Sequence, residues 1–232
     1  MPQSRPRSGH SDSMHVRFLG YSALMPAFQG SLLDTDDELR LADLAGAVRR
    51  TTLTDGAWVD VRPGWVGGAD ELFGLLRDRV DWQAERRRMY EQVVDVPRLV
   101  RFYGAREPLP HPLLAQARRR LSEHYGRELG EPFTTAGLCY YRDGRDSVAW
   151  HGDRIGRSRT HDTMVAIVSV GAPRPLLLRP AGGGRSIRFV VGHGDLLVMG
   201  GSCQRTWEHA VPKVDPSTGP RISVQFRPRD VR

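Results

Sequence analysis

The stretch DLLVMGGSCQRTWEHAVPKVDPSTGPRISVQFR, residues 195–227, decides the fold class of this chain. It contains three short segments with many apolar or β-branched residues, namely Asp195–Met199, Thr206–Ala210 and Arg221–Arg227, and turn residues separate them. Such segments are typical of short strands joined by tight turns. The stretch therefore predicts a β scaffold.

Upstream of this stretch, the same pattern continues back to about Pro132. Four further short strands are predicted there, with Gly-rich turns between most of them. They are Thr135–Arg142, Met164–Val170, Pro175–Arg179 and Ser186–Val191. Many short strands with Gly-rich corners indicate a sandwich or jelly roll. Residues 133–232 are therefore predicted to form a β core.

The N-terminal half of the chain has a different character. Residues 1–25 are predicted to be a disordered leader, because their first part is Pro, Arg, Ser and Gly with little to bury. Residues 26–132 are predicted to form an extension with helices. These helices are expected at Asp37–Ala47, at Ala69–Val80 and from Pro112 to about Tyr125. The whole chain is predicted to be mainly β with flanking helices, an α+β fold.

The overall composition bounds the class of protein. The 232 residues are 39% hydrophobic and 26% charged, which suits one globular catalytic domain. No apolar run approaches the roughly 18 residues of a membrane helix, and no apolar N-terminal segment indicates secretion. Only two cysteines, Cys139 and Cys203, are present, which argues against a disulfide framework and fits a reducing cytoplasm. The net charge of +7 favours a polyanion such as nucleic acid as partner.

A metal site is indicated by His151, Asp153 and His209. The first two lie in a His-x-Asp motif, and side chains two residues apart in a strand can point the same way. Two His and one carboxylate on a β scaffold are typical of non-haem Fe(II) oxygenases, whose metal keeps open positions. An Asp capping a turn beside an ordinary His is the alternative. From spacing alone, His193 and His161 are also alternatives to His209, although neither ends a predicted strand.

An anion site is indicated by Arg221 and Arg227. Residues six apart in a regular strand point to the same face. The intervening Ile222, Val224 and Phe226 point to the opposite face, so the Arg face must meet solvent or a polar cavity. In a cavity, a buried Arg can hold a carboxylate in a bidentate pair. The alternative is two exposed Arg on an edge strand.

Several short phrases in a fixed order make the chain recognisable. They are Gly56-Ala57-Trp58, Pro63-Gly64-Trp65, Val96-Pro97-Arg98, Tyr103-Gly104, Tyr141-Arg142-Asp143-Gly144, His151-Gly152-Asp153, Ile167-Val168-Ser169-Val170-Gly171, His193-Gly194-Asp195-Leu196-Leu197-Val198-Met199, His209-Ala210-Val211-Pro212 and Arg221-x5-Arg227. With them, the chain resembles the AlkB-like Fe(II)/2-oxoglutarate dioxygenases, particularly a bacterial branch, over roughly residues 29–228. The resemblance implies a double-stranded β-helix, or jelly roll, with an N-terminal nucleotide-recognition lid. It also implies iron on His151, Asp153 and His209.

The resemblance further implies a site for 2-oxoglutarate. Arg221 would hold the distal carboxylate with help from Tyr141, and Arg227 would lie beside the keto acid end. The chain departs from the family at Cys139, where many members have Asn, so one hydrogen bond to the co-substrate lacks its usual partner. Ser223 stands two residues after Arg221, where many relatives carry Asn or Thr near the Arg pair. Ser223 and Cys139 are therefore expected, with the resemblance, among the residues that contact the co-substrate.

The substrate lid also departs from the resemblance. Several nucleic-acid members have a Tyr-x-Phe strand that stacks the flipped base, but here Gly104 leads almost directly into Pro108. The stacking aromatic is therefore expected from Tyr90, Tyr103 or the region of Trp82. The residues predicted for the lid are Arg86, Arg87, Arg88, Met89, Tyr90, Arg98 and Tyr103, with the arginines on phosphates.

The implied activity is oxidative demethylation of N-alkylated bases in DNA, of the 1-methyladenine or 3-methylcytosine type. It would use Fe(2+), with 2-oxoglutarate and O2 as co-substrates, and release formaldehyde, succinate and CO2. The base must be flipped out of a duplex or lie in a single strand. The alternatives are RNA, protein or a small molecule as substrate of the same scaffold, and a non-catalytic β-barrel binding module. We expect a monomer in the cytoplasm.

Overall fold

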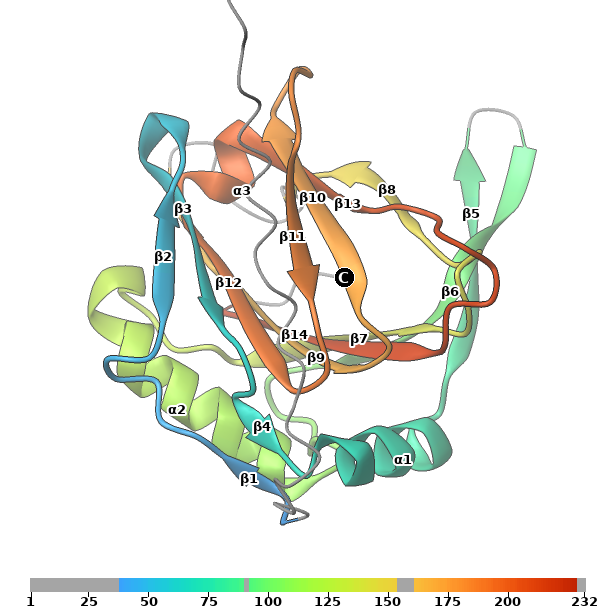
Figure 1. The fold of residues 1–232 in the computed structure, drawn as a ribbon, viewed down its shortest axis with the longest axis horizontal. Coiled ribbons are helices and arrows are strands. Elements are labelled where there is room, and N and C mark those ends of the chain that lie inside the picture. Colours follow the sequence, from blue (N-terminus) through green and yellow to red (C-terminus); the bar gives the residue numbers. More distant parts are fainter. Residues whose placement is uncertain (1–37, 90–91, 154–160, 229–232) are drawn as a thin grey trace, which may run out of the picture.

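Two antiparallel sheets face each other and form the body of the molecule (Figure 1). The computed structural model describes residues 38–89, 92–153 and 161–228. In spatial order, the larger sheet consists of β2 (Arg49–Thr52), β3 (Ala57–Arg62), β12 (Asp195–Gly201), β9 (Val165–Gly171), β14 (Arg221–Arg227), β7 (Thr135–Tyr141), β6 (Gln92–Tyr103) and β5 (Gln83–Met89). The smaller sheet consists of β11 (Ile187–Val191), β10 (Arg174–Pro180), β13 (Trp207–Val211) and β8 (Val148–His151).

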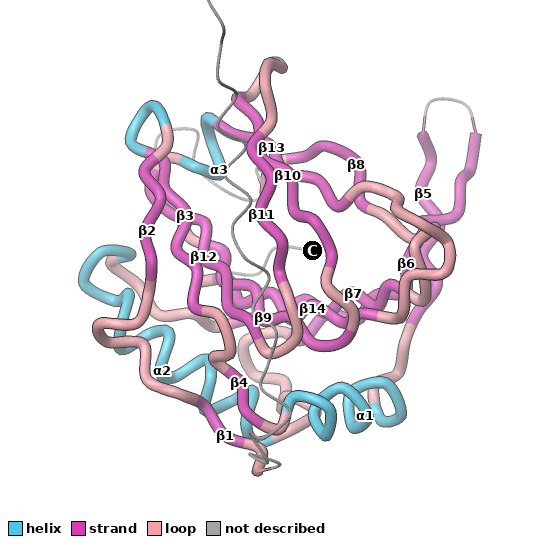
Figure 2. The backbone as a smooth tube through the Cα atoms, viewed as in Figure 1, coloured by secondary structure: helices cyan, strands magenta, loops and turns pink. Residues whose placement is uncertain are grey.

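The remaining elements lie around the two sheets, as the tube in Figure 2 makes plain. They are a short strand pair, β1 (Arg40–Leu41) with β4 (Val66–Gly67), the helices α1 (Ala69–Arg79), α2 (Pro112–Leu129) and α3 (Cys203–Thr206), and the 3-10 turn η1 (Thr54–Gly56). Helices α1 and α2 cover the outer face of the larger sheet (Figure 1). None of the described helices is long and apolar enough to cross a membrane.

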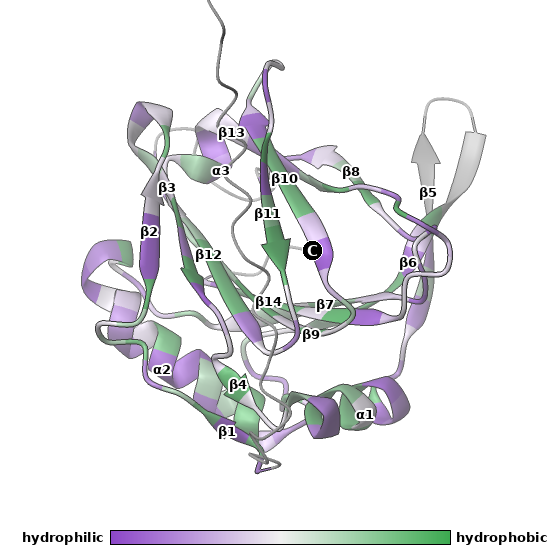
Figure 3. Cartoon of the chain, in the orientation of Figure 1, coloured by the Kyte–Doolittle hydropathy of each residue, from purple (hydrophilic) through white to green (hydrophobic). Residues whose placement is uncertain are grey.

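Strand β9 is buried on both of its faces, which explains its uninterrupted apolar sequence. Val165 and Ile167 point into a core cluster between the two sheets. Ala166 and Val168 point the other way, into a second cluster beneath the helices. Strand β12 is likewise buried along its central residues, whereas β2 is exposed throughout. Figure 3 shows the matching hydropathy, with β12 largely hydrophobic and β2 hydrophilic.

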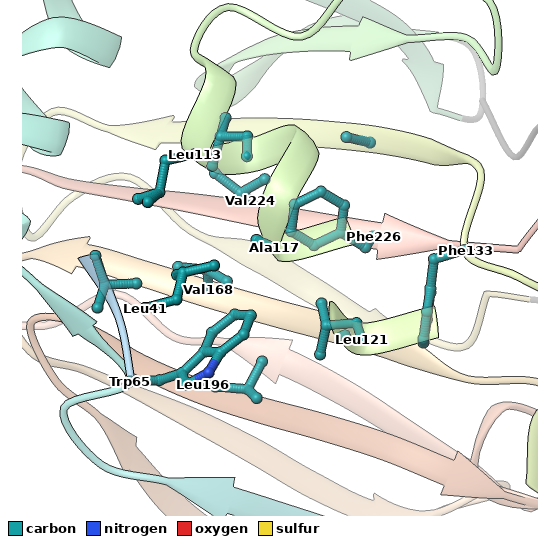
Figure 4. Packing of buried hydrophobic residues seen from close by; sticks show 14 of the residues in the cluster. Leu41, Trp65, Leu113, Ala117, Leu121, Phe133, Val168, Leu196, Val224 and Phe226 are labelled. Atoms are coloured by element: carbon teal, nitrogen blue, oxygen red, sulfur yellow. The ribbon is translucent and has the colours of Figure 1, made fainter. Parts of the chain in front are cut away.

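Helix α2 covers the larger sheet with the face that its periodicity predicts. Its buried residues are Leu113, Leu114, Ala117, Leu121 and Tyr125. In Figure 4, residues of this helix face apolar side chains of the sheet. The helix begins after His111, whose side chain accepts a hydrogen bond from the backbone N–H of Leu113 at 3.2 Å, and it ends at a glycine. The cap and the apolar stripe together define this helix.

Strand β14 has one face in the hydrophobic core and the other face in a pocket between the sheets. Ile222, Val224 and Phe226 are fully buried in the cluster beneath the helices. The side chains that alternate with them, from Arg221 to Arg227, face the interior between the two sheets and line a pocket there. The sequence left two environments open for the arginine face, solvent or a polar cavity. The structure shows the cavity.

The seven strands predicted between residues 135 and 227 are present within one or two residues of their expected bounds. The predicted helix over Asp37–Ala47 is wrong. Asp37 lies outside the described residues, and the remainder contains β1 followed by turns. The backbone carbonyls of Leu41 and Ala42 accept hydrogen bonds from the Arg120 side chain at 3.0 and 3.3 Å. Tertiary contacts thus satisfy groups that a helix would have used internally.

Strands from the N-terminal half also pair directly with the β core. β3 pairs with β12, and β6 pairs with β7, so β2, β3, β5 and β6 extend the larger sheet at its two edges. The Arg-rich segment at residues 83–89 is one arm of the β5–β6 hairpin. The jelly-roll prediction is confirmed, while the division at residue 132 stays a prediction.

The buried face of β14 yields a test of the fold. Phe226→Ala is expected to lower the free energy of unfolding by about 3–5 kcal/mol, because it empties a fully buried site. Val190→Ala is the control, since Val190 is 52% exposed and its truncation should change stability by less than about 0.5 kcal/mol. Urea denaturation followed by circular dichroism measures both, and equal losses would contradict the burial of Phe226.

Candidate metal and co-substrate site

Three ligand-type side chains meet at one end of the pocket between the sheets. His151 ends β8 and His209 lies opposite it in β13, so that strand pairing brings their rings to a centroid distance of 4.2 Å. Asp153 follows two residues after His151, and one carboxylate oxygen lies 3.8 Å from His151 Nε2. One ligand atom from each residue lies within 4.8 Å of the others. Two imidazoles and one carboxylate suit Fe(II) with open positions.

The protonation states of this cluster suit a metal ion. Burial raises the pKa of Asp153, but Arg227, His209 and His151 outweigh burial and hold that pKa below its ordinary value. Burial lowers the pKa of His209 to about 3, and His151 adds to this effect while Asp153 opposes it. An ionised carboxylate and a neutral imidazole are the forms that bind a metal.

Hydrogen bonds orient two of the three ligand candidates. His151 Nδ1 lies 2.9 Å from the carbonyl oxygen of Ala149, so Nδ1 carries the proton and Nε2 is left to face Asp153. The carboxylate of Asp153 accepts from Arg227 Nε at 2.7 Å, and its backbone N–H donates to Gln204 Oε1 at 3.2 Å. Such partners fix ligand orientation and are part of a metal site.

A buried cation without a carboxylate lies at the other end. Arg221 is 3% exposed, and its Nε donates to Ser169 Oγ at 2.8 Å. Burial is the main reason that its pKa is lowered, and no described carboxylate is among its partners. A buried guanidinium without an anion is costly, so this end of the pocket suits an anionic ligand.

Tyr141 lies near two arginines at this end. The Cζ atoms of Arg221 and Arg174 lie 5.3 and 5.4 Å from the centre of its ring. Burial is the main cause that raises the pKa of Tyr141 to about 12, so its hydroxyl remains a hydrogen-bond donor. Arg174, which the sequence did not single out, instead binds the backbone carbonyls of Asp143, Asp146 and Pro212. Arg221 and Tyr141 therefore form the anion end.

One pocket of about 1340 Å³ contains both ends. Its lining includes the three ligand-type residues, Arg221 and Tyr141. It also includes Cys139, Ser223 and Arg227, which the sequence analysis placed beside the co-substrate. The structure thus brings together all eight residues predicted for metal and co-substrate. His193 and His161, the alternatives to His209, are not part of the metal-type cluster. His193 instead accepts a hydrogen bond from the backbone N–H of Gly171 at 2.8 Å.

The predicted lid residues are only partly gathered at the pocket. Arg98 lines it and donates to the carbonyl oxygen of Ser147 at 3.3 Å. Arg86, Arg87, Arg88 and Met89 belong to β5, but their side chains lie outside the described residues, as does Tyr90.

Tyr103 and Trp82, two of the positions from which the stacking aromatic was expected, do not line the pocket. Tyr103 is 7% exposed in the cluster beneath the helices, and Trp82 packs on Tyr140 at 5.3 Å next to the same cluster. Strand alternation explains the outcome for Tyr103, because its neighbour Phe102 points to the opposite face. Phe102 lines the pocket and pairs with Gly137.

Two pocket residues, Phe102 and Gln225, and one hydrogen-bond partner of Asp153, Gln204, were missed from the sequence. Phe102 and Gln225 follow the same alternation as Arg98 and Arg221, so the period of two would have found them. Gln204 lies in α3, far from the His-x-Asp motif in sequence, and no local pattern marks it. Gln204 was missed because only the tertiary fold brings it next to Asp153.

The facing sheets and the two-His, one-carboxylate cluster define a jelly-roll protein with a non-haem iron type of site. A family model described as the 2OG-Fe(II) oxygenase superfamily matches residues 80–227. The chain therefore belongs to the 2OG-Fe(II) oxygenase superfamily, whose name states both iron and 2-oxoglutarate.

Curated relatives narrow the family further. The alpha-ketoglutarate-dependent dioxygenase alkB homolog 3 of Bos taurus is 31% identical over 71% of this chain and 64% of its own length. The corresponding human protein is 30% identical over 78% of this chain and 66% of its own length. The human DNA oxidative demethylase ALKBH2 is 26% identical, with 68% of each chain covered. The predicted resemblance to the AlkB-like enzymes is confirmed, although the chain spans slightly less than two thirds of the first two relatives.

Solved structures share the fold. The structure described as OsALKBH1 superposes with a TM-score of 0.53 at 13% identity, covering 77% of this chain and 99% of the other. An oxidoreductase of the 2OG-Fe(II) oxygenase family from Burkholderia pseudomallei has a TM-score of 0.53 at 14% identity, covering 75% and 86%. At these identities the likeness supports the fold alone.

The cluster generates a test with a built-in comparison. His209→Ala is expected to weaken Mn2+ binding by more than about 100-fold, because loss of an outer-shell partner alone typically costs about 10–100-fold. His193→Ala should bind Mn2+ like the unaltered protein, since His193 lies outside the cluster. Calorimetric titration measures both. Equal affinities for the two variants would show that the metal binds elsewhere.

Proposed function

We propose that this chain is an Fe(II)- and 2-oxoglutarate-dependent dioxygenase that removes N-alkyl groups from bases in DNA. The overall reaction would convert an N-methyl base, 2-oxoglutarate and O2 into the free base, formaldehyde, succinate and CO2. The observation that carries the proposal is the pocket, in which a metal-type triad and a buried Arg221 that has no described carboxylate partner face one cavity.

Each end of the pocket has a defined task in this proposal. His151, Asp153 and His209 would hold the iron, which when bound supplies the activation of oxygen. Arg221 would pair with the distal carboxylate of 2-oxoglutarate, and Tyr141 would donate its hydroxyl hydrogen to the same group. The Arg227 guanidinium would keep the Asp153 carboxylate ionised and oriented. Cys139 and Ser223, between the ends, would contact the body of the co-substrate.

The rest of the pocket supports a nucleobase as the second substrate. The cavity of about 1340 Å³ leaves space beside the co-substrate, and Phe102 supplies an aromatic face in its lining. A cationic N-methylated base is attracted to such a face. A base inside a duplex cannot enter, so the substrate would be a single strand or a flipped nucleotide.

Charge and the relatives point to DNA as the polymer. The chain carries a net charge of +7, and the β5–β6 hairpin beside the pocket carries Arg86, Arg87 and Arg88. Arginines in such a position would contact phosphates. The human relative ALKBH2 is named a DNA oxidative demethylase. Together these features favour methylated DNA over a protein or a small molecule.

The experiment uses the iron-loaded chain with 2-oxoglutarate and a single-stranded oligonucleotide that contains 1-methyladenine or 3-methylcytosine. Succinate and formaldehyde should form together and only with the methylated strand. Succinate without formaldehyde would point to another substrate, and methylated RNA is the first to try. No consumption of 2-oxoglutarate under any condition would contradict the proposal and favour a binding module.

The buried guanidinium of Arg221 gives a sharper prediction. Arg221→Ala is expected to raise the KM for 2-oxoglutarate by roughly 10- to 100-fold, because charge-assisted hydrogen bonds to a buried carboxylate are lost. Mn2+ affinity should stay unchanged, since Arg221 lies at the other end of the pocket. Arg188→Ala, on the exposed face of β11, is the control. An unchanged KM in the Arg221 variant would remove this residue from the co-substrate site.

A further inference from the structure

The pocket face of β14 carries a continuous row of hydrogen bonds that starts at the metal-type cluster. Arg227 Nε donates to Asp153 Oδ2 at 2.7 Å. Arg227 Nη2 donates to Gln225 Oε1 at 3.3 Å, and Gln225 Nε2 donates to Ser223 Oγ at 2.8 Å. Alternation along the strand places these side chains on one face. The row therefore runs from a metal-ligand candidate toward the co-substrate end.

We propose that Gln225 is a positioning residue, which holds the Arg227 guanidinium in the orientation that presents Asp153 to the metal. This inference rests on the proposed iron site and adds a residue to it. Gln225 touches neither Asp153 nor the other two ligand candidates in any hydrogen bond that the structure records. Its effect on the metal would pass through Arg227.

A carboxamide at this position satisfies both of its neighbours in the row, and its acceptor oxygen is the part that Arg227 uses. Arg227 can only donate hydrogen bonds, so it needs an acceptor, and the Gln225 amide oxygen provides one. The Ser223 hydroxyl oxygen accepts from the amide nitrogen. The reverse orientation of the amide would set its NH2 group against the guanidinium, where two donors would meet. A carboxamide in this one orientation satisfies both neighbours.

The opposite strand leaves room for this contact. Gly137 in β7 pairs with Gln225, and a Cβ at Gly137 would lie 3.1 Å from Arg227 Nη1 and 3.5 Å from Gln225 Oε1. The neighbouring Cys139 Sγ lies 3.9 Å from Gln225 Oε1. The Gln225 amide thus lies in the space that a side chain at Gly137 of β7 would otherwise take.

The orientation of Arg227 matters because it determines which carboxylate oxygen of Asp153 is hydrogen-bonded to the guanidinium and which faces His151. Arg227 holds Oδ2, whereas Oδ1 faces His151 Nε2 at 3.8 Å. If the guanidinium rotates, the carboxylate loses its restraint. The Gln225 backbone carbonyl, which accepts from Arg227 Nη1 at 3.4 Å, would survive any substitution of the side chain. The expected effect of losing the side chain is therefore partial.

Two variants of similar length separate the hydrogen bond from packing. Gln225→Met removes the acceptor for Arg227 and should weaken Mn2+ binding by about 3- to 10-fold, at or below the lower end of the range for outer-shell partners. Gln225→Glu keeps an acceptor for Arg227 and should bind Mn2+ within about threefold of the unaltered chain or more tightly. Gln116→Met in α2, also half-buried but outside the pocket, is the matched control and should change nothing.

A double-mutant cycle tests whether the effect passes through Arg227. In an Arg227→Met background, Gln225→Met should have no further effect on Mn2+ affinity. Calorimetric titration of the metal-free proteins gives the affinities without any turnover, and thermal melts of the same samples check folding. An equal loss in both backgrounds, or an equal loss for Gln225→Met and Gln225→Glu, would overturn the proposal.

The outcome also separates this inference from the proposed function. If the unaltered chain binds Mn2+ and forms succinate from 2-oxoglutarate while Gln225→Met binds the metal equally well, the positioning role alone is wrong. If the unaltered chain neither binds Mn2+ nor consumes 2-oxoglutarate, the proposed function fails and the positioning role fails with it. Weaker binding by Gln225→Met with retention by Gln225→Glu supports the proposal.

Discussion

The ion pair between Arg227 and Asp153 is the interaction on which the arrangement of the site depends. Arg227 ends β14 in the centre of the larger sheet, and Asp153 follows β8 at the edge of the smaller one. Both side chains are buried, with Nε and Oδ2 2.7 Å apart. Removing either partner would leave an uncompensated buried charge. The pair therefore joins the two sheets at the point where the carboxylate must meet the two histidines.

The two arginines of β14 have different electrostatic situations although they share one face. Arg227 is neutralised by Asp153 within the protein. Arg221 has a hydroxyl, Ser169 Oγ, as its recorded partner and no described carboxylate. The strand thus positions one cation that is paired with a carboxylate and one that has no described carboxylate partner. A dicarboxylate co-substrate that reaches from the metal to Arg221 would complete the charge balance of the pocket, which is why 2-oxoglutarate fits this chain.

Much of this arrangement could be predicted from the sequence, because it follows from alternation. The period of two in β14 separates Ile222, Val224 and Phe226 from the arginines, and the apolar run of β9 reflects burial on both faces. His209 could be preferred to His193 because His209 lies at the end of a predicted strand and matches the family motif. What failed were segments decided by tertiary contacts. The carbonyls of residues 41 and 42 are bound by a distant arginine, and Gln204 reaches Asp153 from another element. Tyr103 does not line the pocket while its neighbour Phe102 does, because neighbouring residues of a strand point to opposite faces.

The most direct test of the account is a crystal structure of the chain with Mn2+ and 2-oxoglutarate. The account predicts an anomalous metal peak among His151 Nε2, Asp153 and His209, with 2-oxoglutarate in the same pocket and its distal carboxylate on Arg221. A metal bound elsewhere, or a co-substrate carboxylate that avoids Arg221, would contradict it.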